Sequence, residues 1–139
     1  MSIDRTGADL LEAAREAFDR YTIQTAGHVY DALALYVAYT HGAEAFHYAP
    51  RLLLTSAEKR SGKTRTMEIA ICLSRDPLVA ANATVPAIFR SIGERHRTLF
   101  FDEADTIFGT KVKAEMNEDL RGLINAGFQK GTPVLRTVG

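Results

Sequence analysis

The chain has 139 residues, a formal net charge of zero, 46% hydrophobic residues and 24% charged residues. These values place it among soluble globular proteins of one domain's length, and no repeat, low-complexity tract or linker is visible. The balanced charge excludes a general attraction to nucleic acid or to a membrane surface, although a local basic face stays open. No apolar signal core opens the chain, and the longest apolar stretch, Val29–Tyr39, contains Asp31 and is too short to span a membrane.

A single cysteine, Cys72, lies in the apolar stretch 69–73. One thiol forms no internal disulfide, which fits a reducing cytosol, and we therefore expect a cytoplasmic protein. The apolar surroundings favour a small buried hydrophobe over a nucleophile at this position.

The first two expected elements are helices. Thr6-x-x-Asp9 is typical of a capping box and predicts a helix that runs to about Arg20, with Leu10, Leu11, Ala14 and Phe18 on one face. A second helix is expected over 27–40. It is apolar nearly all round, so it should be well buried or contact a partner. Its tyrosines are expected in the core rather than as a platform for stacked bases: Tyr30, Tyr36 and Tyr39.

From residue 50 the chain alternates between expected strands and helices. Strands are expected at 51–55, 78–81, 98–101 and 134–138. Helices are expected at 63–73, from Pro86, and from Met116 to a stop at Gly127. Alternating units of this kind predict an α/β fold with a mainly parallel, helix-covered sheet of about four strands. Residues 1–49 then form an N-terminal helical appendage packed on a core at 50–139.

Ser61-Gly62-Lys63-Thr64 follows the apolar run 52–54 after a short loop. A strand, a loop and a helix N-terminus surround a polyphosphate with backbone N–H groups and a positive dipole end. Lys63 would then reach the β and γ phosphates, and the Thr64 hydroxyl would hold the metal. The pattern is that of a Walker A loop, and it predicts nucleotide contacts at Ala57, Glu58, Lys59, Arg60, Ser61, Gly62, Lys63, Thr64 and Arg65.

One position departs from G-x-x-x-x-G-K-[ST], because Ala57 stands where the first glycine falls. Alanine serves there only at a negative φ, since a left-handed turn would cost it roughly 1 kcal/mol.

An acidic pair ends the later apolar run, in Leu99-Phe100-Phe101-Asp102-Glu103. Such a Walker B strand predicts Asp102 as a magnesium-organising carboxylate and Glu103 as the base that polarises the attacking water. Asp102-Glu103-Ala104-Asp105 also spells a helicase signature. That interpretation is rejected because those helicases need two recombinase-like domains, more than this length holds.

Most of the chain resembles the P-loop ATPase domain found in actinobacterial, plasmid and phage proteins, often beside primase–polymerase modules. The similar segments are 31–41, 56–64, 80–82, 100–109 and 120–127. The resemblance implies a P-loop NTPase three-layer sandwich, ATP and Mg²⁺ as ligands, and a DNA replication or DNA-processing role in a phage or mobile element. In ATPases of this branch a fifth strand and a lid follow the segment that ends here at Gly139, so we expect a core that lacks both. The bare edge of the first strand would then favour self-association or pairing with a full-length ATPase relative.

The leading hypothesis is an ATP- and Mg²⁺-binding ATPase with weak or partner-dependent hydrolysis, with Lys63 and Glu103 as catalytic residues and with Thr64 and Asp102 at the metal. DNA binding stays open without support from the net charge. The alternative is a truncated, non-hydrolysing regulatory or interaction protein that modulates a full-length relative or another partner. A small-molecule kinase ranks last, because no acceptor pocket can be recognised.

Overall fold

The computed structural model describes residues 5–55, 62–80, 85–102, 118–127 and 129–131. Contacts divide the chain into two compact units, one formed by Met1–Gly42 with Leu52–Pro77 and the other by Ala43–Arg51 with Leu78–Gly139. The class is α/β, with helices and a small parallel sheet. Among the helices of the described ranges, none combines the length and the apolar character needed to cross a membrane.

Helix α1, Gly7–Tyr21, begins as its sequence predicts. The Thr6 side chain accepts from the backbone N–H of Asp9 at 3.2 Å, and the Asp9 carboxylate accepts from the backbone N–H of Thr6 at 2.8 Å. This reciprocal capping box satisfies donors that a helix start leaves unpaired. At the other end the N–H of Thr22 donates to the carbonyl of Phe18 at 2.9 Å, and the chain turns away from the helix axis.

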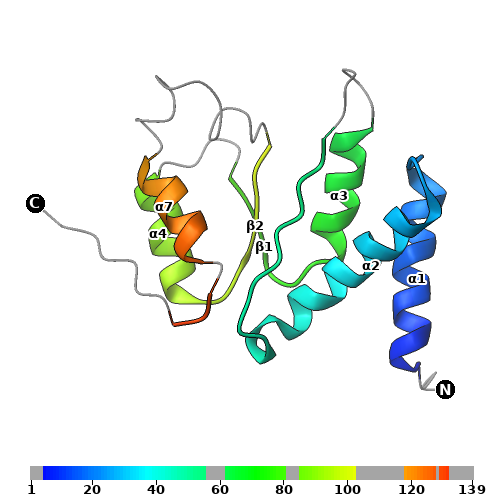
Figure 1. Ribbon diagram of the computed structural model, residues 1–139, viewed down its shortest axis with the longest axis horizontal. Helices are drawn as coiled ribbons and strands as arrows, with labels where there is room; N and C mark the ends of the chain where they lie inside the picture. The colour runs from blue at the N-terminus through cyan, green and yellow to red at the C-terminus, as the bar shows by residue number, and fades with distance from the viewer. Residues whose placement is uncertain (1–4, 56–61, 81–84, 103–117, 128, 132–139) are drawn as a thin grey trace, which may run out of the picture. The chain divides into compact units, whose positions relative to one another are not determined.

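Three helices build the first unit. Helix α2 spans Gly27–Gly42, helix α3 spans Lys63–Leu73, and α1, α2 and α3 all pack against one another (Figure 1). Their buried apolar residues form the core of this unit and come from all three helices: Phe18, Leu33, Ala34, Val37 and Ala70. The burial of these side chains is the main favourable term that holds the three helices together.

Polar groups join α2 and α3 where both helices end. The Oγ1 of Thr40 donates to the carbonyl of Val37 at 2.6 Å and accepts the backbone N–H of Arg75 at 3.0 Å. The Nε2 of His41 lies 2.8 Å from the carbonyl of Leu73, so it must carry the proton of this hydrogen bond. The carbonyl of Leu73, which the end of α3 leaves without a partner in its own helix, is satisfied in this way.

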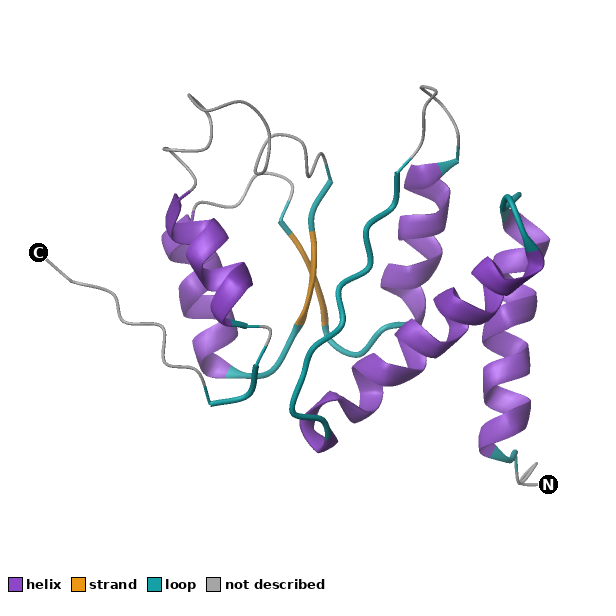
Figure 2. Cartoon of the chain, viewed as in Figure 1, coloured by secondary structure: helices purple, strands orange, loops and turns teal. Residues whose placement is uncertain are grey.

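The second unit contains a β–α–β unit. Strand β1, Pro77–Val79, leads into helix α4, Val85–Glu94, and then into strand β2, Thr98–Phe100, which pairs with β1. Helix α7, Glu118–Ala126, ends immediately before Gly127, as its sequence predicts. Figure 2 shows α4 and α7 on one side of the strand pair. The core on this side is centred on the buried Ile88, against which pack Ala80, Ile92, Leu99, Phe101 and Ile124.

The predicted sheet of about four strands is not confirmed, because the sheet within the described residues has two strands. Segment 51–55, expected as the first strand, has no strand partner among the described residues, and Leu53 in it is 68% exposed. A strand needs a partner strand along its edge. The segment also does not belong to one unit, because Arg51 is part of the second unit and the residues from Leu52 onward are part of the first. The guanidinium of Arg51 donates to the carbonyl of Ile124, and the nearby Tyr48 forms an isolated antiparallel bridge with Gln129.

The remaining predicted boundaries differ little from those observed. The expected strand 78–81 is observed as Pro77–Val79, and the N–H of Ala80 still donates to the carbonyl of Phe100 at 2.8 Å. The expected strand 98–101 ends at Phe100. The last expected strand, 134–138, lies outside the described residues. The division into a helical appendage and a core at residue 50 stays a prediction.

The expected burial of Cys72 was wrong, since its side chain is exposed. The buried residues of α3 are Thr66 and Ala70, one turn apart, and Cys72 comes two positions later, on the opposite side of the helix. The apolar composition of 69–73 therefore did not decide which way the thiol faces.

Two other expectations on burial need correction. Leu10 was expected on the apolar face of α1 but is 56% exposed, whereas Phe18 on the same helix is fully buried. The tyrosines of α2 lie at an intermediate depth rather than in the core: Tyr30, Tyr36 and Tyr39. The rings of Tyr36 and Tyr39 pack with centroids 6.4 Å apart. Burial, and then the neighbouring Tyr39, raise the pKa of Tyr36.

Candidate functional site: the start of helix α3

Helix α3 begins at Lys63, at the residue that the sequence predicts. Its N-cap is Gly62, which has φ 81° and ψ 4° and therefore lies in the left-handed region. A side chain at this φ would strain the backbone, so glycine suits the position on conformational grounds alone. Lys63 and Thr64 follow in the first helical turn with exposed side chains. The backbone N–H groups of a first turn have no partner within their own helix, and the helix dipole makes this end attractive to anions.

The other predicted contacts around this turn have different outcomes. Arg65 is exposed, and its Nη1 lies 3.0 Å from the Oε2 of Glu68 on the same helix, a partner that sequence reasoning did not identify. The loop residues with predicted nucleotide contacts that lie outside the described residues are Ala57, Glu58, Lys59, Arg60 and Ser61.

Behind this turn lies a polar network that sequence reasoning missed. The hydroxyl of Thr66, a buried residue, donates to the carbonyl of Gly62 at 3.2 Å, and the backbone N–H of Thr66 donates to the same carbonyl at 3.0 Å. The Nε2 of Gln24, in the loop between α1 and α2, donates to the hydroxyl of Thr66 at 3.1 Å. A glutamine in a short polar loop carries no sequence signal for such a contact, because its partner lies 42 residues away.

The network continues from Gln24 into the end of α1. Gln24 Nε2 also donates to the hydroxyl of Thr22 at 3.0 Å, and that hydroxyl donates to the carbonyl of Phe18 at 2.7 Å. The backbone N–H of Gln24 donates to the hydroxyl of Tyr30 at 3.0 Å, and Tyr30 donates to the carbonyl of Thr22 at 3.3 Å. The loop is thus tied to α1, α2 and α3 by side-chain hydrogen bonds.

The predicted acidic residues follow strand β2 in the second unit. Asp102 comes two residues after the end of β2 and is exposed, while Glu103 lies outside the described residues. Since β1 and β2 are parallel, their carboxyl ends lie at the same edge of the sheet, and Asp102 follows that edge. Lys63 and Thr64 belong to the first unit. Within the ranges that the structure describes, no group of three or more His, Cys, Asp or Glu side chains could by itself hold a metal ion.

The chain is similar to part of two curated proteins. It is 33% identical over 104 residues to the bifunctional pantoate ligase/cytidylate kinase of Prochlorococcus marinus strain MIT 9303, and equally so to the protein of the same name from strain MIT 9313. The similarity covers 67% of this chain and 21% of each relative, so the chain spans about a fifth of the length of the curated relatives it matches. No protein-family model matches the chain. No solved structure matches it either.

Proposed function

We propose that the chain binds a nucleoside triphosphate, ATP in the first place, together with Mg²⁺ at the start of α3. The observation that carries this proposal is the left-handed Gly62, which caps a helix whose first two residues are Lys63 and Thr64. A glycine turn, exposed N–H groups, an ammonium group and a hydroxyl together form the parts from which phosphate cradles are built. The two relatives are named in part as cytidylate kinases, which supports nucleotides as the class of ligand.

The proposed roles follow from the chemistry of each side chain. Lys63 binds the β and γ phosphates as a point charge, and the hydroxyl of Thr64 is a hard oxygen ligand of the kind that Mg²⁺ takes. Asp102 supplies a second oxygen for the ion, and Glu103 orients and deprotonates the attacking water. Residues 57–61 and Arg65 complete the contacts with the nucleotide.

For the activity and the biological role, we propose an ATPase of a replication or DNA-processing type from a phage or mobile element, with slow or partner-dependent hydrolysis. Phosphoryl transfer is accelerated chiefly by charges placed around the γ-phosphate, and a supplied arginine is worth about 10³ to 10⁵ in rate. Self-association or association with a longer ATPase would supply such groups. The alternative of another class is a non-hydrolysing regulatory or interaction protein that modulates a full-length relative or another partner, and it would release no phosphate on its own or with DNA.

Titration calorimetry of the folded wild-type chain with ATP and Mg²⁺ tests the binding proposal. Lys63→Ala should weaken binding at least tenfold, since a hydrogen bond to a charged group is worth about 1.5–3 kcal/mol. Arg5→Ala is the matched control, because it removes one exposed positive charge from the same unit ahead of α1. Equal affinities of Lys63→Ala and wild type, or no binding by either, would overturn the proposal.

The similarity to part of two bifunctional pantoate ligase/cytidylate kinases favours a nucleotide kinase as the second candidate function. Incubation with ATP, Mg²⁺ and cytidine monophosphate separates the candidates, because a kinase forms cytidine diphosphate whereas an ATPase releases inorganic phosphate. Formation of the diphosphate by wild type but not by Lys63→Ala would establish the kinase. Release of phosphate without the diphosphate would favour the ATPase. The absence of both products, from the chain alone and with a longer ATPase added as partner, would favour the interaction protein.

A further inference from the structure

The loop between α1 and α2 contacts α3 at the turn where we place the phosphates. Gln24 contributes the contact, and it lies partly buried between Thr22 and Thr66, both of which are buried. Its side-chain amide donates to both hydroxyls, at 3.0 Å and 3.1 Å.

The direction of these bonds is determined by the groups at their far ends. Each threonine hydroxyl has one proton, and it donates that proton to a backbone carbonyl, Thr22 to Phe18 and Thr66 to Gly62. Both hydroxyls must then accept from Gln24, so the NH₂ group of Gln24, and not its oxygen, faces them. A side chain that offered an acceptor here would force the hydroxyls to turn away from the carbonyls.

We propose that Gln24 is a positioning residue for the nucleotide site, an inference that rests on the proposed function. Gln24 holds the hydroxyl of Thr66, and Thr66 holds the carbonyl of the N-cap Gly62 through two hydrogen bonds. The orientation of Gly62 determines where the N–H groups of the first turn point. A phosphate cradle acts through donors that are already in place, so a loosened Gly62 should weaken nucleotide binding without any lost contact to the ligand.

Contacts of the Gln24 backbone support this role. The backbone N–H of Gln24 is bonded to Tyr30, and the guanidinium carbon of Arg15 lies 6.0 Å from the centre of the Tyr30 ring. Gln24 is therefore held at its backbone as well as at its side-chain amide. Through these hydrogen bonds it fixes the start of α3 relative to α1 and α2.

The test uses the full chain and the pair Gln24→Met and Thr66→Val, which keep size and remove a hydrogen-bonding group. Each variant should weaken ATP·Mg²⁺ binding about fivefold to tenfold, the size expected for the Gln24–Thr66 hydrogen bond that both variants lose. The double variant should be little weaker than either single one, because both changes break the same link. Thr66→Ser restores the hydroxyl and should bind ATP nearly as well as wild type.

Val37→Ala controls for a general loss of stability, since it removes buried methyl groups from the same unit and Val37 takes part in none of the hydrogen bonds of the network. Its melting temperature should fall at least as far as that of Gln24→Met, while its ATP affinity stays within about twofold of wild type because the site is untouched. Weakening of ATP binding by Val37→Ala to the same degree as by Gln24→Met would overturn the positioning role.

Amide hydrogen exchange on the nucleotide-free protein separates this inference from the proposed function. Exchange at the backbone N–H of Thr66, which donates to the carbonyl of Gly62, should be faster in Gln24→Met than in Val37→Ala. If the wild-type protein binds no nucleotide and the two variants still differ in exchange, the proposed function is overturned and the control of α3 by Gln24 is supported. Normal nucleotide binding with no difference in exchange would overturn the inference and leave the function standing.

Discussion

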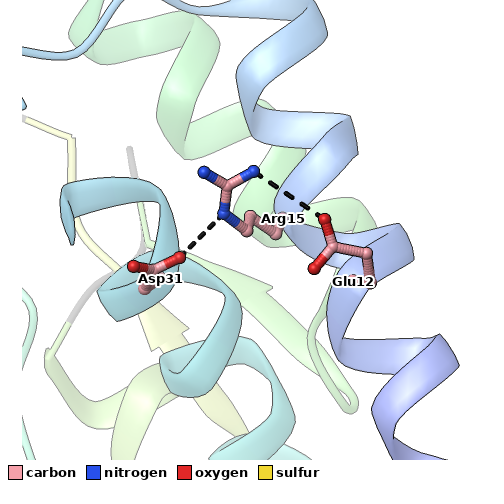
Figure 3. Close-up of polar contacts among 3 residues, drawn as sticks. All are labelled: Glu12, Arg15 and Asp31. Atoms are coloured by element: carbon pink, nitrogen blue, oxygen red, sulfur yellow. Dashed lines mark hydrogen bonds and ion pairs between the residues drawn. The ribbon is translucent and has the colours of Figure 1, made fainter. Parts of the chain in front are cut away.

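Arg15 on α1 and Asp31 on α2 form an ion pair, with the Nε of Arg15 lying 2.8 Å from the Oδ1 of Asp31. Figure 3 shows the guanidinium of Arg15 between Asp31 and Glu12. The Nη1 of Arg15 lies 3.8 Å from the Oε1 of Glu12. The hydrogen bond to Asp31 is the chief cause that raises the pKa of Arg15. The pair joins two helices that lie one after the other in the chain, at a place where their side chains remain partly in water.

Because this pair is partly exposed, we expect it to contribute little to stability. Asp31→Asn should lower the melting temperature slightly, and the difference from wild type should shrink as salt is added, because exposed charges are screened. Leu33→Ala, two residues away and fully buried, should cost about 2–5 kcal/mol at any salt concentration. Thermal unfolding at low and high ionic strength compares the two. A loss in Asp31→Asn as large as that in Leu33→Ala would show that the pair is a main support of the helix packing.

The capping box should make the start of α1 sensitive to acid. Hydrogen bonds from the side chain and then the backbone of Thr6 lower the pKa of Asp9 below its ordinary value of 3.8. The stability that this carboxylate contributes is therefore present above pH 3.8 and is lost as the pH falls through the lowered pKa. Circular dichroism during acid titration should show a smaller acid-induced loss of helix in Asp9→Asn than in wild type.

Asp19→Asn is the control for this titration, since Asp19 is an exposed carboxylate of the same helix outside the capping box. At neutral pH, Thr6→Ala should cost about 1 kcal/mol, as expected for the loss of an N-cap side chain. The acid prediction fails if Asp9→Asn and Asp19→Asn lose helix over the same pH range and to the same extent as wild type.

Gly62 should be harder to replace than its open surroundings suggest. A Cβ at Gly62 would meet no atom of the described residues within 4 Å, but the φ of 81° at this position is strained for any other residue. Gly62→Ala should therefore cost about 1 kcal/mol of stability through backbone strain. Gly7→Ala is matched to it, because Gly7 also opens a helix with free space around it and has no positive φ. Chemical denaturation of both variants gives the two free energies, and equal values would show that the left-handed turn is not strained by alanine.

The proposed roles of the acidic pair predict different effects for its two members. Asp102→Asn should lower the affinity for ATP in the presence of Mg²⁺ and have little effect in its absence, because the lost charge acts through the ion. Glu103→Gln should leave ATP affinity unchanged and suppress hydrolysis, because an amide cannot take the proton of the attacking water. Calorimetry with and without Mg²⁺ and a phosphate-release assay measure both. Hydrolysis by Glu103→Gln at the wild-type rate would remove Glu103 from the mechanism.

The helices could be predicted closely from the sequence because their signals are local. The capping box of Thr6 and Asp9 needs residues three positions apart, and the predicted start of α3 at Lys63 rests on the adjacent Gly62. The end of α7 before Gly127 is a signal of the same kind. The motif at 61–64 is a local signal too, and it predicts a site at the start of α3.

Only the tertiary structure decided the features that depend on partners far away in the chain. Segment 51–55 has the composition of a strand and pairs with no other described segment as a strand, and Cys72 lies in an apolar stretch and is exposed. Gln24 could not be recognised at all, because its role arises from a bond to Thr66, 42 residues further on. Local patterns determine where a helix begins and ends, since its hydrogen bonds close within a few residues. Strand pairing, burial and the support of a site are decided by which surfaces meet when the chain folds.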